Sequence, residues 1–365
     1  MRVSFDDQIF SHQVRGGISN YFVNLALEFE AQPSHGVDLS GFPIFTKNAH
    51  VMEAGLGFPL GSKSLSRAAI LRVSNRALAS WRRMRGFAEP EIIHHTYYFD
   101  QIQKQYGSAR RVVTVHDMTP ELYPNDFPGG NPHALKRQHV YEADAIACVS
   151  ETTKADLLAI CPGITAPVLV TPLGVAPEFR PDPMHGDQHG NYFLFVGARG
   201  SYKNFDLLLK ALAILSKRSK ANLLLIGGGP IRSDEAERFA RLGLEGRIRQ
   251  TTPSNRELVD IYRKAICLVF PSKYEGFGLP ALEAMASGCP ALLSEAPALK
   301  EVGGEAGEYF PVDDADYLAT KMLEVERNEE YRVDLQQRGM ERSSAFSWSR
   351  TASLTRQCYA KAMER

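Results

Sequence analysis

Short apolar runs alternate with amphipathic stretches along most of the chain, and this alternation constrains the fold more than any other feature. The apolar runs include RRVVTVHD, YFLFVGA, NLLLIGG and ICLVFPS, and each ends in polar or glycine-rich residues. Stretches with helical periodicity lie between such runs, for example residues 17–31, 204–218 and 315–327. Near-continuous apolar strands separated by helices are typical of parallel sheets covered on both faces. The sequence therefore predicts a doubly wound α/β fold.

The length of the chain predicts two domains, because 365 residues exceed what one ordinary hydrophobic core holds. Residues 173–191 are rich in proline, glycine and polar residues and have no apolar periodicity, which indicates a linker. We expect one doubly wound domain over residues 1–180 and a second over residues 181–342. The tail, residues 343–365, has a helical pattern.

Composition excludes several classes of protein. Basic and acidic residues number 42 each, so no net charge directs the chain toward nucleic acid. The five cysteines include no C-x-x-C pair, which argues against a zinc site and a disulfide framework. The start, MRVSFDDQIF, lacks the basic and apolar regions of a secretory signal, and no apolar run is long enough to span a bilayer. We therefore expect a cytoplasmic protein with reduced thiols.

The stretch PSKYEGFGLPALEAMASGCP, residues 271–290, carries the most informative polar residues. It follows an apolar strand, and a helix with an early proline begins at its centre. Gly276 and Gly278 let the backbone approach a ligand, and the free N–H groups of a helix start suit a phosphate. Glu275 is placed to accept hydrogen bonds from sugar hydroxyls, and Glu283, one helical turn on, from a vicinal diol such as that of a ribose. A glutamate here also stabilises the helix dipole by about 0.3 to 1 kcal/mol without any ligand.

Two other strand ends in the second half carry candidate ligand contacts. Arg199 and Lys203 follow YFLFVG, where fixed positive charge suits a diphosphate leaving group, although solvated surface cations are the ordinary alternative. The stretch IGGGPIRSD, residues 226–234, lacks the G-x-G-x-x-G spacing, which argues against a nicotinamide site. Its glycines predict either close approach to a nucleotide or a plain tight turn.

The first half offers fewer candidates. Gly16 and Gly17 precede a helix, so amides there could face an anion or a sugar, with a simple turn as the alternative. The run RRVVTVHD ends in His116 and Asp117, and a strand end places such residues better for ligand contact than for packing. The adjacent histidines of IIHHTYYFD point to opposite faces of a strand and so do not form a metal site.

Residues 62–87 predict a basic amphipathic helix with no acidic residue. Its cations are Lys63, Arg67, Arg72, Arg76, Arg82, Arg83 and Arg85. Such a helix either lies on an anionic membrane surface or packs normally with a solvated basic face, and the sequence leaves both open. The stretch DDAD, residues 313–316, precedes a helix and predicts an N-cap rather than a magnesium site. We expect no metal.

Together these motifs resemble the retaining glycosyltransferases of family 4, which have the GT-B fold. EGFGLPALEAMASGCP is similar to the E-x7-E element of that family, GGISNYFVNLA to its Gly-Gly loop, VHDMTPE to its His-Asp strand end and VGARGSYKN to its Arg/Lys loop. The resemblance implies two Rossmann-like domains that face a central cleft. Residues 1–180 would take the acceptor side and residues 181–342 the donor, and the helix in 343–365 would return to the first domain.

The resemblance also implies a role for each matching position. Lys203 and Arg199 would bind the diphosphate, Glu275 the hydroxyls of the donor sugar, and His116 the sugar near its reacting centre. Many relatives have Arg directly before the Lys of this loop, where this chain has Tyr202, so the equivalence of Arg199 is a hypothesis. The implied substrate-binding residues are Glu283, Gly16, Gly17, Asp117, Phe277, Gly278 and Leu279.

The implied reaction transfers a hexose with retention from a nucleotide-diphosphate sugar to a glycan or lipid-linked acceptor. It would serve the assembly of a cell-surface polysaccharide such as lipopolysaccharide, without metal or cofactor, on the inner face of the membrane. Resemblance to bacterial polysaccharide mannosyltransferases favours GDP-mannose, and a UDP-sugar-dependent transferase of the same fold stays open. The remaining alternative, a nucleotide-sugar-binding protein without chemistry, is disfavoured by the retained Glu275, Glu283, Lys203 and His116. Nucleic acid is not an expected partner.

Overall fold

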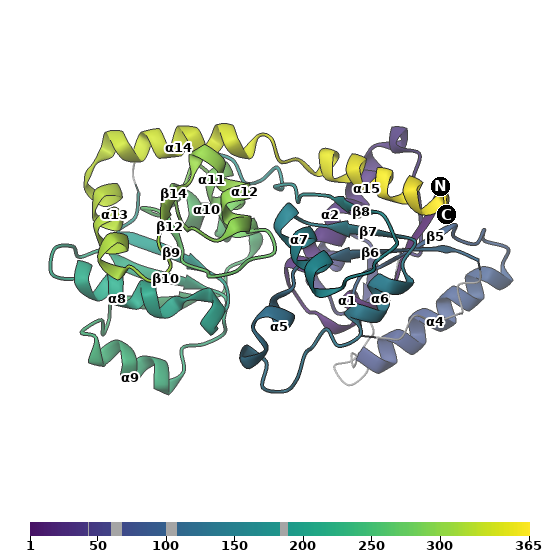
Figure 1. Ribbon diagram of the computed structural model, residues 1–365, viewed down its shortest axis with the longest axis horizontal. Helices are drawn as coiled ribbons and strands as arrows, with labels where there is room; N and C mark the ends of the chain where they lie inside the picture. The colour runs from purple at the N-terminus through teal and green to yellow at the C-terminus, as the bar shows by residue number, and fades with distance from the viewer. Residues whose placement is uncertain (43, 60–67, 100–107, 183–188) are drawn as a thin grey trace. The chain divides into compact units, whose positions relative to one another are not determined.

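The computed structural model describes residues 1–42, 44–59, 68–99, 108–182 and 189–365. The chain divides into two compact units, one formed by Met1–Gly174 with Trp348–Arg365 and the other by Val175–Ser347 (Figure 1). Each unit contains a six-stranded sheet in which all neighbouring strands are parallel. The predicted fold of two Rossmann-like domains is therefore confirmed. Residues 183–188 of the predicted linker lie outside the described residues.

The sheet of the first unit has the order β2-β1-β5-β6-β7-β8. Its strands are β1 (Arg2–Phe5), β2 (Asp38–Ser40), β5 (Ile92–His95), β6 (Arg110–Val115), β7 (Ala145–Cys148) and β8 (Val168–Val170). Strands β3 (Ile44–Thr46) and β4 (Gly57–Pro59) pair separately. Every residue of the central strands β5 and β7 is buried, as expected for parallel strands with helices on both faces.

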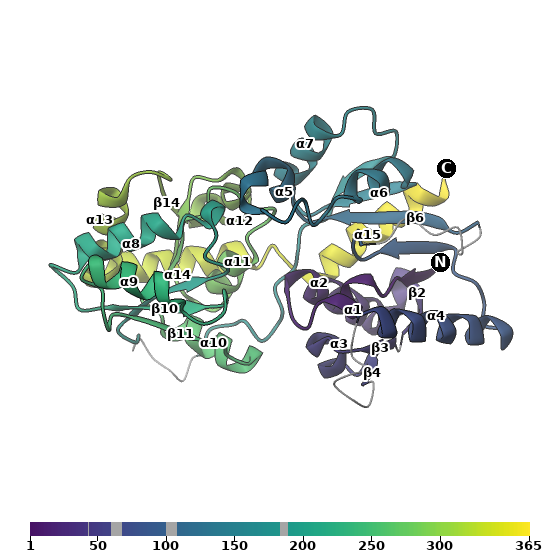
Figure 2. The ribbon, with the colours of Figure 1, turned by 90° about the horizontal axis from the view of Figure 1, so that it is seen from below.

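The helices of the first unit cover both faces of this sheet (Figure 2). They are α1 (Gln8–His12), α2 (Gly17–Ala31), η1 (Pro33–His35), α3 (Ala49–Glu53), α4 (Ala68–Met84), α5 (Thr119–Leu122), η3 (Pro124–Asp126), α6 (Lys136–Glu142), α7 (Glu151–Ile160) and α15 (Trp348–Met363). The C-terminal helix α15 belongs to this unit. The Tyr359 hydroxyl lies 2.8 Å from His94 Nδ1, and the Thr351 hydroxyl donates to the Pro172 carbonyl over 2.7 Å.

The sheet of the second unit has the order β11-β10-β9-β12-β13-β14. Its strands are β9 (Tyr192–Val196), β10 (Asn222–Ile226), β11 (Ile248–Thr251), β12 (Leu268–Phe270), β13 (Ala291–Ser294) and β14 (Glu308–Phe310). Strand order therefore reverses between β9 and β12, and in the first unit it reverses between β1 and β5. Open α/β sheets bind ligands beyond the carboxyl ends of the strands at such switch points. The loops after these four strands are therefore the places to look for a site.

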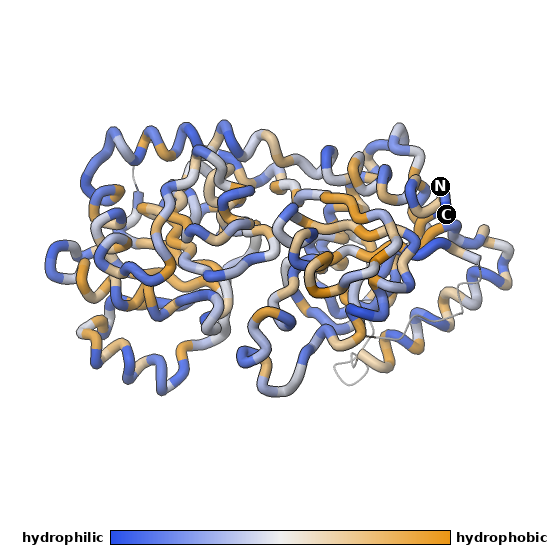
Figure 3. Tube along the Cα trace, in the orientation of Figure 1, coloured by the Kyte–Doolittle hydropathy of each residue, from blue (hydrophilic) through white to orange (hydrophobic). Residues whose placement is uncertain are grey.

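The helices of the second unit surround a core of aliphatic and aromatic side chains from the strands. They are η4 (Ser201–Lys203), α8 (Phe205–Leu215), α9 (Ser233–Arg241), α10 (Asn255–Lys264), α11 (Leu279–Ala286), α12 (Pro297–Gly303), η5 (Gly304–Ala306), α13 (Ala315–Arg327) and α14 (Glu329–Ser343). In Figure 3 hydrophobic residues gather along the interior strands, whereas α14 is largely hydrophilic. This polarity explains why the apolar pattern did not predict α14.

Candidate active site

The loops that leave β9 and β12 meet at the switch point of the second sheet. Lys203, the last residue of η4, donates from Nζ to Glu275 Oε1 over 2.6 Å. The N–H of Lys273 donates to the carbonyl of Tyr202 over 2.8 Å, so the main chain also joins the two loops. The side chains of Lys203 and Glu275 are 14% and 12% exposed. The structure thus brings together a cation and a carboxylate that lie 72 residues apart in the chain, at a partly accessible position.

The position of Lys203 is set by the turn that follows it. Asn204 has a φ of 53°, in the left-handed region that asparagine tolerates better than most residues. Its side-chain amide donates to the carbonyl of Val312 over 2.7 Å and so fixes the turn. The ammonium of Lys203 also lies 5.2 Å from the ring centre of Tyr202 and 5.6 Å from that of Phe270. Aromatic faces attract a cation without neutralising it.

The start of α11 needs its glycine for reasons of packing. Gly278 is the N-cap of α11 with a φ of 111°, and a Cβ there would lie 2.6 Å from a methyl carbon of Leu299. The ring of Phe277 is buried and lies 6.0 Å from that of Phe346. The ring of Phe277 is therefore packed within the fold, and a ligand contact through the backbone amides of Phe277, Gly278 and Leu279 stays a prediction.

Glu283 lies in the fifth position of α11 and is buried. Its Oε2 accepts a hydrogen bond from the hydroxyl of Tyr262 over 3.0 Å. Burial raises the pKa of Glu283 to about 8, the bond from Tyr262 opposes this rise, and the charge of Glu178 adds to it. The carboxyl group is therefore largely protonated at neutral pH, a state that the sequence pattern does not predict.

Arg199 lies in a different environment from the one expected. Its guanidinium donates to both carboxylate oxygens of Glu235, at 2.7 and 3.0 Å. The Nη atoms also donate to the carbonyls of Gly227, Gly229 and Pro230 over 3.0 to 3.2 Å. The side chain is 2% exposed. The expected two-cation clamp is thus not formed in this structure, because the guanidinium of Arg199 is bound within the fold.

The three consecutive glycines at 227–229 close around Arg199. Their φ values lie between 69° and 83°, a range that favours glycine. A Cβ at Gly228 would lie 2.5 Å from Nη1 of Arg199, so the guanidinium occupies the space beside the turn. Of the two alternatives that the sequence left open, the turn is therefore observed, and approach to a nucleotide stays a prediction.

Two glycines at the start of α2 have different surroundings. A Cβ on Gly16 would overlap the side-chain amide of Gln13, whose oxygen accepts from the N–H of Ser19 over 3.2 Å. A side chain at position 16 would therefore displace the end of the Gln13 side chain and its contact with Ser19. Gly17 is exposed, and a Cβ there would meet no atom within 4 Å. The fold itself gives no steric reason for a glycine at position 17. The prediction that a ligand approaches the backbone at Gly17 therefore stays open.

His116 and Asp117 follow β6 in the first unit. The imidazole of His116 packs edge-on against the ring of Tyr21 at 5.1 Å, and its Nε2 is buried without a hydrogen-bond partner among the described residues. Burial lowers the pKa of His116 to about 3, so the ring is neutral. Asp117 accepts from the N–H of Thr119 over 2.8 Å. Burial acts to raise the pKa of Asp117, but Lys136, His133 and that N–H lower it overall.

The sequence did not reveal the network at the switch point of the first sheet. Asp6 follows β1, and its Oδ2 lies 2.7 Å from His95 Nδ1 and accepts from the amide of Gln8 over 2.7 Å. Its Oδ1 accepts from the N–H of Thr96 over 3.0 Å and from the Thr96 hydroxyl. The side chains of Asp6 and His95 are each 5% exposed. The only signal in the sequence was a carboxylate directly after a strand.

The predictions for the neighbouring histidines and the DDAD stretch can also be checked. His94 contacts Tyr359 and Thr114, whereas His95 contacts Asp6, so the two side chains point to opposite faces of β5 as predicted. Asp314 caps α13 and accepts from the N–H of Tyr317 over 2.8 Å. Within the described ranges no three potential ligands of the His, Cys, Asp and Glu types gather as a metal site would require.

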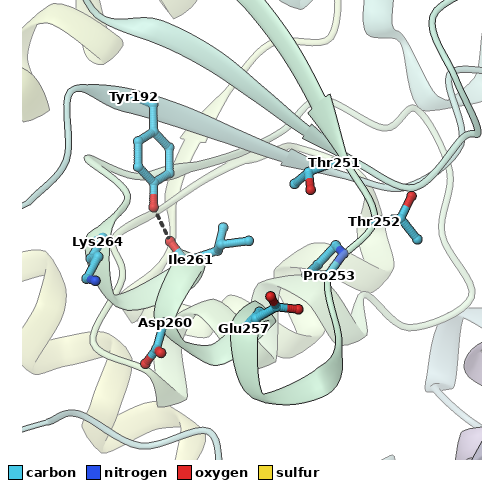
Figure 4. A pocket seen from close by; sticks show the side chains of 8 residues that line it. All are labelled: Tyr192, Thr251, Thr252, Pro253, Glu257, Asp260, Ile261 and Lys264. Carbon is cyan, nitrogen blue, oxygen red and sulfur yellow. Dashed lines mark hydrogen bonds between the residues drawn. The ribbon is translucent and has the colours of Figure 1, made fainter.

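A pocket of about 330 Å³ lies beside α10 in the second unit (Figure 4). Thr251 and Thr252 enter it from the end of β11, and the hydroxyl of Tyr192 donates to the carbonyl of Ile261 over 2.8 Å on another side. None of the residues that line this pocket was predicted as a site residue. The side chains of Lys203, Glu275 and Glu283 thus lie outside it.

Family models match both halves of the chain. The model described as "Glycosyltransferase Family 4" matches residues 15–179, and the model described as "Glycosyl transferases group 1" matches residues 183–342. The chain is a glycosyltransferase of the family 4 type with the GT-B fold. Its curated relatives include O-antigen chain mannosyltransferase B of Escherichia coli, 26% identical over 76% of this chain and 77% of that protein. D-inositol 3-phosphate glycosyltransferase of Corynebacterium efficiens is 28% identical over 76% of this chain and 73% of that protein.

Solved structures share the fold of this glycosyltransferase. Sucrose-phosphate synthase from Thermosynechococcus elongatus has a TM-score of 0.72 and 21% identity, and covers 100% of this chain and 99% of its own. WaaG, a glycosyltransferase involved in lipopolysaccharide biosynthesis, has a TM-score of 0.66 and 13% identity, and covers 98% and 99%. At these identities the likeness establishes the architecture alone.

Proposed function

We propose that this glycosyltransferase moves a hexose, with retention, from a nucleotide-diphosphate sugar to a glycan or lipid-linked acceptor. The observation that carries the proposal is the contact between Lys203 and Glu275 at the switch point of the second sheet. A diphosphate accepts hydrogen bonds from an ammonium, and a carboxylate accepts them from sugar hydroxyls. One donor molecule can therefore satisfy both side chains by entering between them.

Lys203 and Glu275 would act on different parts of the donor, the diphosphate and the sugar. As the bond between C1 of the sugar and the phosphate oxygen breaks, negative charge builds on the diphosphate and positive charge on the sugar. Lys203 would stabilise the leaving diphosphate, since a fixed charge acts strongly where charge develops in the transition state. The acceptor oxygen then bonds to C1 on the same face, and its proton passes to a phosphate oxygen. Glu275 would hold the hydroxyls of the donor sugar during this step.

The remaining donor contacts follow from the start of α11. The amides of Phe277, Gly278 and Leu279 would face the donor, and the buried carboxyl of Glu283 would bind the ribose. In the first unit we assign Gly17, His116 and Asp117 to the reacting sugar and the acceptor. For Arg199 we propose a positioning role, in which it holds the turn of glycines beside the candidate donor site.

GDP-mannose is the donor that we propose. Two relatives, O-antigen chain mannosyltransferase B of Escherichia coli and RfbU of Salmonella typhimurium, are 26% and 28% identical and are named for mannose transfer in O-antigen assembly. A UDP-linked hexose is the alternative. Melting-temperature shifts with GDP-mannose, GDP, UDP-glucose and UDP distinguish the two, because a ligand at 100 times its Kd adds about 2.7 kcal/mol to the free energy of unfolding.

Stereochemistry tests the reaction class directly. The anomeric configuration of the product, measured by NMR with the best donor from the thermal screen, should match that of the donor. An inverted product would contradict the proposed retention while leaving glycosyl transfer intact. If no donor stabilised the protein and none was consumed, the proposal as a whole would fail.

We also propose that α4 contacts an anionic membrane surface on the cytoplasmic side. Only Leu71 and Asn75 are buried in this helix, whereas Trp81 and Met84 are 46% and 79% exposed. Phe87, just beyond the helix, is 60% exposed. Exposed apolar side chains among arginines are typical of a helix that lies in a lipid interface. Lys63 and Arg67 of the predicted basic stretch lie outside the described residues, and no helix in the described ranges is long and apolar enough to cross a bilayer.

Vesicle sedimentation tests this contact. The protein should bind vesicles of phosphatidylglycerol and phosphatidylethanolamine at low salt and less at high salt, because surface charge is screened. The double variant W81S and M84S should bind less. The matched control L158S changes a 41%-exposed leucine on α7 and should not alter binding. Equal binding by the wild type, the double variant and L158S, or no binding at low salt, would contradict the proposal.

A further inference from the structure

Lys136 is a lysine buried beneath the turn that carries His116 and Asp117. It is the first residue of α6, and its side chain is 2% exposed. Lysine is among the residues least often buried, because its ammonium loses the hydration of bulk water. A buried ammonium therefore needs specific partners, and those partners indicate what the charge does.

The partners of Lys136 all belong to the segment that follows β6 or to the strand end beside it. Its Nζ donates to the backbone carbonyl of Asp117 over 2.8 Å and to Oε2 of Glu121 over 2.9 Å. The ammonium also lies 5.7 Å from the ring centre of Tyr98, which follows β5. The other carboxylate oxygen of Glu121 accepts from the amide of Asn131 over 3.1 Å. Lys136 therefore links the residue next to His116 to the first turn of α5.

The charge of Lys136 acts on His116 and Asp117 in opposite senses. It disfavours a second positive charge on the imidazole and favours a negative charge on the carboxylate. Burial is the main cause of the lowered pKa of His116, and Lys136 adds to it, whereas burial acts to raise the pKa of Asp117 and Lys136 is the main group that lowers it. The charged and titratable groups around His116 are Asp117 on the same turn, His133 before α6, Lys136 on α6, His94 on β5 and Tyr21 on α2.

We propose that Lys136 is a positioning residue for glycosyl transfer, whose ammonium fixes the His116–Asp117 turn by holding the Asp117 carbonyl and Glu121. This inference rests on the proposed function, in which His116 meets the reacting sugar. A neutral imidazole hydrogen-bonds a hydroxyl without adding positive charge next to a sugar that itself becomes positive. Lys136 would thus hold the imidazole and the neighbouring carboxylate in the position that the reaction needs.

The test compares variants that separate charge from hydrogen bonding. K136M removes both, K136Q keeps a donor for the Asp117 carbonyl, and K136R keeps the charge. The matched control is K321M. Lys321 is also largely buried and paired, to Glu308 at 2.9 Å and Glu324 at 3.1 Å, but it lies in the second unit. K321M should cost stability without changing His116.

The first readout is NMR of ¹³C-labelled histidine, with the His116 signal assigned from H116N. The wild-type imidazole should stay neutral from pH 5 to 8. K136M and K136Q should both shift the ¹³C resonances of the neutral His116 ring, because the ammonium no longer holds the turn, whereas K136R and K321M should leave them unchanged. Identical His116 resonances in the wild type, K136M and K136Q would overturn the proposal. This readout needs no substrate, so it remains informative even if the proposed reaction is not observed.

The second readout is the pH dependence of kcat/KM for transfer. In K136M and K136Q the fall on the acid side should move to higher pH, and kcat at neutral pH should drop by up to about 100-fold, as expected when a reacting group is misplaced. The Kd of the free nucleoside diphosphate should stay unchanged, because the contacts proposed for it belong to the second unit. K136R should restore most of the rate. A uniform loss at every pH, equal in K136M and K321M, would mean that Lys136 contributes only stability.

Discussion

The two switch points of the molecule share a reversal of strand order, but their charged side chains differ in exposure and in hydrogen-bond partners. In the first unit the loops after β1 and β5 enclose Asp6 among Thr96, Gln8 and His95, with the carboxylate 5% exposed. In the second unit the loops after β9 and β12 present Lys203 and Glu275, which are 14% and 12% exposed. The carboxylate of Asp6 is closed by hydrogen bonds from its own unit, whereas Glu275 has a lysine partner that a donor would replace under the proposed function. The strand order reverses at both places, and the local side chains make the second more accessible than the first.

Removal of Asp6 should disrupt the hydrogen bonds at the first switch point and destabilise the fold more than any other proposed substitution. D6A leaves His95 and Thr96 without their buried acceptor, and such losses cost about 3 to 5 kcal/mol. Both tryptophans, Trp81 and Trp348, lie in the first unit, so the midpoint of the urea transition followed by tryptophan fluorescence measures this change. A midpoint like that of the wild type would mean that the network is dispensable.

The ionisation of Asp6 also makes this stability depend on pH. Burial acts to raise the pKa of Asp6, but its bonds with His95 and Thr96 lower it to about 2, below the ordinary value of 3.8. A lowered pKa adds stability that is complete above the ordinary value and disappears as the pH falls toward 2. The difference between the wild type and D6N should therefore shrink over that range.

Removal of Lys203 should have the opposite profile, with a large effect on rate and a smaller one on folding. K203A should lower kcat by about 100- to 1000-fold, because a fixed positive charge no longer meets the leaving diphosphate. The two side chains are 14% and 12% exposed, so loss of the pair should cost about 1 to 3 kcal/mol of stability, less than the loss of Asp6. Steady-state kinetics and thermal melting measure the two. Nearly unchanged kcat in K203A would assign this switch point a structural role like that of the first.

The pH dependence of donor binding tests whether Glu283 binds the ribose as an ionised carboxylate. If the ribose hydroxyls bind the ionised carboxylate, donor affinity should rise by up to about tenfold, or 1.4 kcal/mol, for each unit by which the pH increases toward 8, since a pKa near 8 leaves the carboxyl of the ligand-free protein protonated below that pH. Calorimetry at pH 6, 7 and 8 should show this trend in the wild type and its absence in E283Q. A wild-type Kd that does not vary with pH would exclude binding by the ionised form.

The same group should lower the stability of the ligand-free protein as the pH rises. The folded pKa of Glu283 lies above its ordinary value of 4.5, so the folded state keeps a proton that the unfolded state releases. Stability is then greatest below pH 4.5 and decreases as the pH rises toward 8. E283Q should flatten this dependence between those two values, as measured by urea denaturation at a series of pH values.

The sequence predicted the framework of the fold and part of the candidate site. Helical periodicity predicted α2 and α13 at their observed bounds. The strand-end rule predicted that Lys203 and Glu275 lie at one edge of a sheet, and they are in contact. Helix α14 was missed because its sequence, EEYRVDLQQRGMERS, is mostly polar.

The surroundings of each side chain could not be predicted in the same way. Arg199 and Lys203 are four residues apart in one loop. Arg199 is nevertheless enclosed by the glycine turn that follows β10 and by Glu235 of α9. Lys136 and Glu121 lie in no motif, and only the fold brings the ammonium beneath Asp117. Burial, which determines the protonation of His116 and Glu283, depends on contacts distant in the chain.

Under the proposed function, Lys203 binds the diphosphate of the donor at the switch point between β9 and β12. The most direct test is the calorimetric Kd of the preferred nucleoside diphosphate for the wild type, K203M and K210M, where Lys210 is an exposed lysine of α8 that serves as the control. We expect K203M to bind at least about tenfold more weakly, consistent with the 1.5 to 3 kcal/mol of a hydrogen bond to a charged group, and K210M to bind like the wild type. Equal Kd values for all three proteins would contradict the account.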